Sequence, residues 1–239
     1  MENTWDVAAA LERVRGTVND ACEQAGRDPS EVRLLPVSKT KPPEVCREVY
    51  AAGVRQLGEN KVQEAAAKHE ALADLTDLEW VVIGHLQTNK AKVVAQFAAE
   101  FQALDSLRLA AELDKRLQAA GRQLDVLVQV NSSGEDTKFG VPPEEMAAFT
   151  AELGAFDALR VRGLMTLAVF SDDHERVSEC FVRMRQVQAE LQDRDGGGWE
   201  DLSMGMSGDY QLAIAHGATT VRVGQAIFGD RLNPNDYWH

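Results

Sequence analysis

The segment EVRLLPVSKTKPPEVCREVYAAGVRQLGEN, residues 31–60, contains one complete strand–helix–strand unit. The apolar run Val32–Ser38 is typical of a buried strand. It is followed by the helical pattern Pro43–Ala52 and by a second short run, Gln56–Glu59. Two strands joined by a helix lie parallel in one sheet, because the helix carries the chain back to the edge from which the first strand started. This unit predicts an α/β fold.

The same alternation continues along the rest of the chain. Six further strands are predicted at Trp80–His85, Phe101–Leu104, Asp125–Asn131, Val161–Leu167, Leu202–Met204 and Thr220–Gly224. Helical patterns are found at Val62–Leu72, Lys90–Ala98, Leu107–Ala120, Pro143–Leu153, Asp173–Arg194 and Asp209–His216. Eight strands predict closure into a single (β/α)8 TIM barrel, and 239 residues suit a fold that takes about 250. An open doubly wound sheet is the alternative.

A further amphipathic helix, roughly Trp5–Gly26, precedes the first strand. The prediction is therefore a TIM barrel with an extra N-terminal helix. We expect residues 1–239 to form one domain, with the leading helix in residues 1–27 and a loose tail at residues 234–239.

The composition argues against several classes of function. A formal net charge of −13 disfavours binding to nucleic acid or to an anionic membrane. The sequence has no apolar run of membrane-spanning length and no signal-peptide pattern. Cys22, Cys46 and Cys180 lie far apart, which is typical of buried reduced thiols in a cytoplasmic protein. No metal site is predicted, because no pair of His or Cys residues has ligand spacing.

Lys39 is the most informative single residue. In a TIM barrel, the groups that do chemistry lie at the carboxyl ends of the strands, and Lys39 directly follows the first predicted strand. Partial desolvation at the barrel mouth lowers the pKa of a lysine and frees the lone pair that condenses with an aldehyde. The alternative is a solvated lysine, like Lys41 two residues later.

The loops after the last two strands predict an anion site, because loops seven and eight of TIM barrels often bind phosphate. They read SMGMSGD (203–209) and VGQA (223–226). Glycine lets backbone amides approach an anion closely. Ser207 is placed to cap the following helix, whose N-terminus then faces the anion. A plain helix cap and a tight turn are the alternative.

Arg222 lies within the last predicted strand, between two valines. It either faces a ligand inside the barrel or forms a structural ion pair. Beside a phosphate loop it can reach a cofactor ring nitrogen, and arginine in that place is one way in which proteins bind pyridoxal 5'-phosphate (PLP). Because arginine keeps its proton, the ring nitrogen stays unprotonated and PLP is then a poor electron sink. Asn60 and His85 also follow strands, where such residues are usually structural.

Seven stretches of the chain are distinctive in their order and spacing. They are LLPVSKTKP (34–42), QLGENKVQE (56–64), WVVIGHLQTNK (80–90), VLVQVNSSGEDTKFG (126–140), RGLMTL (162–167), LSMGMSGD (202–209) and TTVRVGQAIFG (219–229). Together they resemble the pyridoxal phosphate homeostasis protein family, which implies a barrel similar to the N-terminal barrel of fold-type III alanine racemases. The chain departs from that pattern at Pro36, Lys61 and Gln225, where alanine, tyrosine and threonine or serine are common.

The resemblance implies a cofactor site residue by residue. That site comprises Lys39, Asn60, His85, Met206, Ser207, Arg222, Gly224 and Gln225. Within it, Lys39 carries PLP as a Schiff base, Arg222 contacts the ring nitrogen, and Ser207 binds the phosphate together with the backbone of the last loop. Asn60, His85 and Met206 line the pocket.

The function that the resemblance implies is PLP binding for intracellular vitamin B6 homeostasis. We expect a cytoplasmic monomer with little or no catalysis of its own, and apo-PLP enzymes as partners that receive the cofactor. The racemase second domain, which supplies a catalytic tyrosine in trans, has no counterpart among the matched stretches. A PLP-dependent amino-acid racemase of low activity is the first alternative. A PLP-free barrel that acts on a phosphorylated metabolite is the second.

Overall fold

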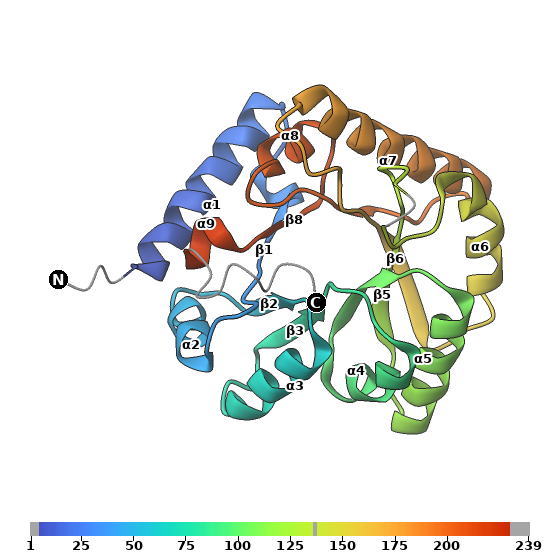
Figure 1. Ribbon diagram of the computed structural model, residues 1–239, viewed down its shortest axis with the longest axis horizontal. Coiled ribbons are helices and arrows are strands. Elements are labelled where there is room, and N and C mark those ends of the chain that lie inside the picture. The colour runs from blue at the N-terminus through green and yellow to red at the C-terminus, as the bar shows by residue number, and fades with distance from the viewer. Residues whose placement is uncertain (1–4, 136–137, 230–239) are drawn as a thin grey trace.

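The computed structural model describes residues 5–135 and 138–229, and its centre is one barrel of parallel strands surrounded by helices (Figure 1). The strands are β1 (Arg33–Pro36), β2 (Gln56–Glu59), β3 (Glu79–Val82), β4 (Glu100–Leu104), β5 (Leu124–Gln129), β6 (Leu159–Met165), β7 (Asp201–Ser203) and β8 (Thr220–Val223). From β2 to β8 each strand pairs with the next, and β8 pairs with β1. A parallel bridge between Val37 and Gly58 joins β1 to β2. This ring confirms the predicted TIM barrel, and the open doubly wound alternative is wrong.

The helices form the outer layer and agree with the predicted order. They are α1 (Val7–Gln24), α2 (Pro43–Ala51), α3 (Val62–Ala71), α4 (Ala91–Phe97), α5 (Leu107–Ala120), α6 (Met146–Leu153), α7 (His174–Asp195), α8 (Tyr210–Ala215) and α9 (Gln225–Phe228), with short 3-10 turns η1 (Pro29–Glu31), η2 (Thr88–Lys90) and η3 (Pro143–Glu145). α1 begins at Val7 because the carboxylate of Asp6 accepts the backbone N–H of Ala9 and caps it.

The extra N-terminal helix covers the part of the barrel wall where the last strand, β8, pairs with the first strand, β1. α1 packs against α8 and α9, and the indole N–H of Trp5 donates to the carbonyl oxygen of Ile227 at 2.7 Å (Figure 1). α9 was not predicted from the sequence and has only four residues. It is therefore too short to cover the wall at β8 and β1, and α1 supplies the missing apolar surface.

The apolar core has two parts. The larger part combines side chains from both the strands and the surrounding helices. A separate cluster of Leu35, Val37, Val81 and Ile83 is made only of residues in or directly after β1 and β3. A Cβ atom at Gly58 would touch Leu35 and Val37, so these side chains face across the barrel rather than toward a helix. Side chains alternate along a strand, so the next residue, Ser38, faces outward.

Two further predictions from the sequence concern the burial of the cysteines and the absence of membrane-spanning segments. The cysteines are buried, as predicted, and burial raises the pKa of the Cys46 thiol to about 11. In the described ranges, none of the helices combines the length and apolar character that a membrane span requires. The expected loose tail at residues 234–239 lies outside the described residues.

Candidate functional site

The predicted site residues come from the carboxyl ends of five neighbouring strands. β7, β8, β1, β2 and β3 are consecutive around the barrel. Met206 and Ser207 follow β7, Arg222 lies in β8, Gly224 and Gln225 follow it, and Lys39, Asn60 and His85 follow β1, β2 and β3. The fold therefore brings residues that are far apart in the sequence to one sector of the barrel mouth.

Lys39 is half-buried in the turn that follows β1. Leu35 and Val37 face the barrel interior, and Lys39 follows them in the turn at the same end of β1. The next residue, Thr40, adopts a φ of 64°, which is uncommon for a β-branched residue. Backbone strain of this kind concentrates at functional sites, where the surrounding structure maintains it.

A buried ion cluster lies behind this turn, on the outer face of the barrel wall. We call Ser38, Glu59, Glu64 and Lys68 the Lys68 cluster. The ammonium of Lys68, on α3, donates to the carbonyl oxygen of Ser38 (2.8 Å), to Oε1 of Glu59 (2.6 Å) and to Oε1 of Glu64 (2.7 Å). The hydroxyl of Ser38 donates to the same oxygen of Glu59 (2.5 Å), and Glu64 also accepts the backbone N–H of Thr40 (2.6 Å).

The charges of this cluster depend on one another. Burial raises the pKa of Glu59 to about 7, although Lys68 opposes this effect. Burial alone would lower the pKa of Lys68, but Glu59 and Glu64 together raise it above its ordinary value. Neither Lys68 nor Glu64 was among the predicted site residues. Their only sequence signal is the i,i+4 spacing of Glu64 and Lys68 on one helix, which is common on any helix surface.

The two glycine-containing loops predicted to bind an anion lie side by side. The hydroxyl of Ser207 accepts the backbone N–H of Ala226 at 3.5 Å, which connects the loop after β7 with the start of α9. A Cβ atom at Gly224 would lie 3.2 Å from the carbonyl oxygen of Val37, so this loop approaches β1 closely. Gly205 has a φ of +95°, which favours glycine. Both loops thus have the close backbone packing expected of an anion site.

The prediction that Ser207 caps the following helix is wrong. Asp209 is the N-cap residue of α8, and residues 207–209 form a turn before it. The carboxylate of Asp209 accepts the backbone N–H of Met206 at 2.6 Å, and burial raises its pKa. The hydroxyl of Ser207 instead accepts from the neighbouring loop, at the N–H of Ala226.

Arg222 lies in the barrel interior and is 3% exposed. Its Nη1 donates to the hydroxyl of Ser203 at 2.6 Å, and its Nη2 donates to the carbonyl oxygen of Thr166 at 2.7 Å. Burial lowers the pKa of Arg222 to about 10, while Asp209 opposes this effect. The guanidinium therefore keeps its charge at neutral pH, and hydrogen bonds fix its orientation.

A directed chain of hydrogen bonds continues from Arg222 through the barrel. Ser203 donates to Oε1 of Gln102 (2.7 Å), whose amide nitrogen donates to Glu100 (2.6 Å). Glu100 forms a bidentate pair with Arg33 at 2.7 and 2.9 Å. A carboxylate only accepts, so the amide NH2 must face Glu100, its oxygen must face Ser203, and Ser203 must then accept from Arg222. The orientation of the arginine is thus set from the opposite end of the barrel.

His85 and Asn60 form the other side of the predicted site. Nδ1 of His85 lies 3.2 Å from a carboxylate oxygen of Asp105, and its ring stacks on Phe139 with centroids 3.8 Å apart. Phe139 was not predicted as a site residue, because this contact joins loops 54 residues apart. Asn60 is half-buried, and Gly84 packs against it so closely that a Cβ atom there would lie 2.1 Å from the Asn60 carbonyl oxygen.

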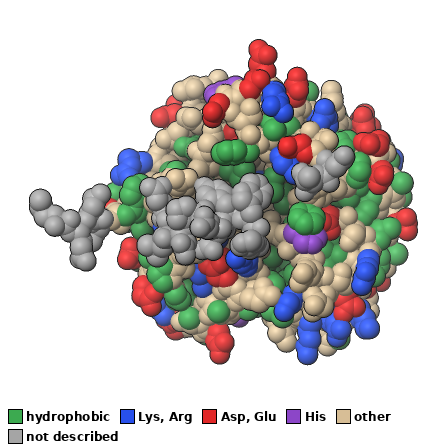
Figure 2. Space-filling view, in the orientation of Figure 1, with side chains coloured by type: hydrophobic (Ala, Val, Ile, Leu, Met, Phe, Trp, Pro, Cys, Tyr) green, Lys and Arg blue, Asp and Glu red, His purple; other side chains and the backbone are tan. Residues whose placement is uncertain are grey.

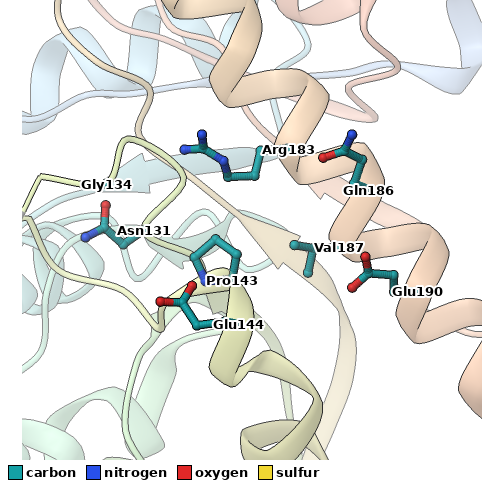
Figure 3. A pocket seen from close by; sticks show the side chains of 8 residues that line it. All are labelled: Asn131, Gly134, Pro143, Glu144, Arg183, Gln186, Val187 and Glu190. Carbon is teal, nitrogen blue, oxygen red and sulfur yellow. The ribbon is translucent and has the colours of Figure 1, made fainter.

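A hollow of about 530 Å³ lies elsewhere, between α7 and the connection from β5 to α6 (Figure 3). It is lined by Asn131, Gly134, Pro143, Glu144, Arg183, Gln186, Val187 and Glu190. None of the predicted site residues lines it, and Arg183 is already bonded to the carbonyl oxygen of Ser132.

Among the described residues, no cluster of His, Cys, Asp and Glu could hold a metal ion. Acidic and basic side chains are interspersed on the face in Figure 2.

Comparison with protein families and solved structures agrees with this geometry. Residues 11–232 match the family model of the alanine racemase N-terminal domain. The pyridoxal phosphate homeostasis protein of Aquifex aeolicus is 45% identical over 92% of this chain and 96% of its own length. The protein of the same name from Escherichia coli (strain K12) is 40% identical over 95% of this chain and 97% of its own.

Solved structures extend the comparison. PipY of Synechococcus elongatus, determined with PLP bound, has a TM-score of 0.82 and 36% identity, and the match covers 93% of this chain and all of PipY. Alanine racemase of Clostridium difficile has a TM-score of 0.73 at 15% identity over 96% of this chain and 58% of the racemase, which shows a shared fold alone. The chain therefore belongs to the pyridoxal phosphate homeostasis protein family and has the fold of the alanine racemase N-terminal domain.

Proposed function

We propose that this chain carries PLP as a Schiff base on Lys39 and serves intracellular PLP homeostasis, as a cytoplasmic monomer with little or no catalysis of its own. The observation that best supports this proposal is the structure of PipY with PLP bound, because that protein is 36% identical over 93% of this chain. The family name supports the homeostasis role. Apo-PLP enzymes are the proposed recipients of the cofactor.

The residues present suit the aldehyde, the phosphate and the ring nitrogen of PLP. An aldehyde requires an amine, and Lys39 lies at the barrel mouth. A phosphate requires hydroxyl and backbone donors at close approach, as the loops at Ser207 and Gly224 provide. A ring nitrogen requires a partner inside the barrel, where the buried guanidinium of Arg222 lies.

The chemistry assigned to the chain is limited to binding and orientation. When bound, PLP supplies an aldehyde that forms imines with amines and stabilises negative charge at an adjacent carbon. The neutral amine of Lys39 adds to that aldehyde, and one water leaves for each imine formed. Arg222 keeps its proton at neutral pH, so it donates a hydrogen bond and gives no proton to the ring nitrogen. A PLP ring with an unprotonated nitrogen withdraws electrons less strongly, which favours a role as a carrier of PLP over a role as a catalyst.

Borohydride reduction tests the attachment directly. Hydride reduces the carbon–nitrogen double bond of a Schiff base to a stable secondary amine, so PLP-loaded protein is expected to carry one reduced PLP on the peptide that contains Lys39. Peptide mass spectrometry locates the adduct. An adduct found mainly on Lys41 or Lys61, or no adduct on loaded protein, contradicts the proposal.

Amino-acid turnover tests the proposed lack of catalysis. Holo-protein incubated with L-alanine is expected to racemise it at well below about 1 s⁻¹, the lower end of the usual range for enzymes. Chiral chromatography of the amino acid measures the rate, with the Lys39→Ala variant as the background. Turnover at or above about 1 s⁻¹ supports the racemase alternative instead.

A further inference from the structure

The hydrogen bonds of the Lys68 cluster converge on the two peptide units that flank Lys39. The carbonyl oxygen of Ser38 belongs to the unit before Lys39, and it accepts from Lys68 at 2.8 Å. The N–H of Thr40 belongs to the unit after Lys39, and it donates to Glu64 at 2.6 Å. The orientations of these two units define φ and ψ of Lys39. Holding both therefore sets the direction in which its side chain leaves the backbone.

Burial and saturation distinguish this cluster from an ordinary surface ion pair. The side chains of Lys68 and Glu59 are 5% and 0% exposed. All three N–H groups of the Lys68 ammonium have acceptors: Ser38, Glu59 and Glu64. A buried ammonium is costly, and apolar replacement of buried ion pairs is often neutral or favourable for stability. Core stability alone therefore does not account for the charges here.

Two further observations at the same place indicate constraint. Thr40 adopts the left-handed conformation, which its bond to Glu64 maintains. Within the described ranges, the buried side-chain oxygens that lack a hydrogen-bond partner are Thr40 Oγ1 and Glu59 Oε2. Unsatisfied polar atoms and backbone strain are tolerated where geometry matters more than stability. α3 lies outside the barrel beside β2 and β3, so it acts as the fixed support for the turn (Figure 1).

We propose that Lys68 and Glu64 are positioning residues for Lys39: they fix the turn so that its amine meets the PLP aldehyde, and they thereby set the fraction of bound PLP that is in the Schiff base. This inference rests on the proposed function. The phosphate loops lie on β7 and β8, away from α3, so the cluster controls attachment and not the capture of PLP by its phosphate.

The test compares Glu64→Leu with Glu64→Gln in the full chain loaded with PLP. Total bound PLP is measured after acid release, and the Schiff-base fraction is measured from its visible absorption across pH. Glu64→Leu is expected to bind PLP but to lower the Schiff-base fraction by about tenfold or more, because the charge-assisted hydrogen bonds of Glu64 with Thr40 and with Lys68 are both lost. Glu64→Gln keeps an acceptor for Thr40, so it should restore most of that fraction. The midpoint of the pH profile should shift in Glu64→Leu and return in Glu64→Gln.

Lys68→Met is the second variant, and it removes all three hydrogen bonds at once. It is expected to show a larger loss of the Schiff-base fraction than Glu64→Leu. Arginine at this position is not equivalent, because a planar guanidinium does not reproduce three divergent donors. The matched control is Glu112→Leu, which breaks another i,i+4 carboxylate pair, Glu112 with Arg116 at 2.6 Å on α5. This control should behave as the wild type.

The outcomes separate this inference from the proposed function. A normal Schiff-base fraction and pH profile in Glu64→Leu, even with a lowered melting temperature, would overturn the positioning role and leave the proposed function intact. A wild-type protein that binds PLP without any Schiff base would overturn both. Because Glu64 is 25% exposed, its substitution is milder than that of Lys68 and yields a folded protein for the measurement.

Discussion

Replacement of Lys39 by alanine is expected to abolish the visible Schiff-base absorption of PLP-loaded protein and to shorten the residence time of PLP. On the proposed attachment, release from the wild type requires hydrolysis of the imine, whereas the variant would hold PLP only through the proposed contacts with the loops after β7 and β8 and with Arg222. At PLP concentrations about 100 times Kd, binding stabilises a folded protein by about 2.7 kcal/mol. For a chain of this size that corresponds to a rise in Tm of about 5–11 °C. At the same PLP concentration, Lys39→Ala should show less than half of this rise.

The control for this prediction is Lys92→Ala, since Lys92 is exposed on α4 and is not among the predicted site residues. It should keep the absorption band, the residence time and the thermal shift. Stopped-flow trapping of released PLP by an apo-enzyme measures the release rate. Equal release rates from wild type and Lys39→Ala would mean that exchange at Lys39 does not control release.

The second large effect is expected at Gly84. A Cβ atom there would lie 2.1 Å from the carbonyl oxygen of Asn60, so the backbone after β2 must move in Gly84→Ala. Overpacking of this kind costs about 1–3 kcal/mol. The corresponding fall in Tm is about 2–12 °C for a chain of this length. Because Asn60 belongs to the proposed site, PLP affinity should fall as well.

Gly154→Ala is the matched control for Gly84→Ala. Nothing lies within 4 Å of a Cβ atom at Gly154, and its φ of −61° suits any residue. Alanine there should leave Tm unchanged or raise it slightly, because it restricts the unfolded chain. Thermal unfolding and PLP titration of both variants measure these effects. A Gly84→Ala protein with wild-type Tm and PLP affinity would show that the backbone after β2 can shift at this point without loss of stability.

Much of the fold could be predicted because the pattern that encodes it is local. Apolar runs such as Val32–Ser38 alternate with amphipathic segments, and eight repeats leave few topologies other than a closed barrel. The boundaries were less accurate, since β1 ends at Pro36 and α8 begins at Tyr210. Helix α9 was missed because four residues after a glycine carry no periodic signal.

In the candidate site, too, the features that depend on neighbouring residues could be predicted, and those that depend on contacts between distant segments could not. The position of Lys39 at the barrel mouth followed from its place after a strand, which is a property of neighbouring residues. The Lys68 cluster could not be predicted, because it depends on β1 lying beside β2 and on Lys68 of α3 reaching the turn after β1. The stacking of Phe139 on His85 is likewise a contact between distant loops. The predicted cap at Ser207 was wrong because the helix starts later than that cap requires, with Asp209 at its N-cap.

The packing of α1 against α8 and α9 has a consequence for synthesis on the ribosome. Trp5 and its hydrogen-bond partner Ile227 are separated by 222 positions in the chain. At about 5–20 residues per second, the helix that emerges first waits roughly 10–45 s for the segment that covers it. During that interval the apolar face of α1, which includes Leu11, Val14 and Val18, lacks its partners α8 and α9, and only earlier elements such as α2 can pack against it. The last strand, β8, and the short helix α9 therefore complete the barrel and also cover α1, the first helix to be synthesised.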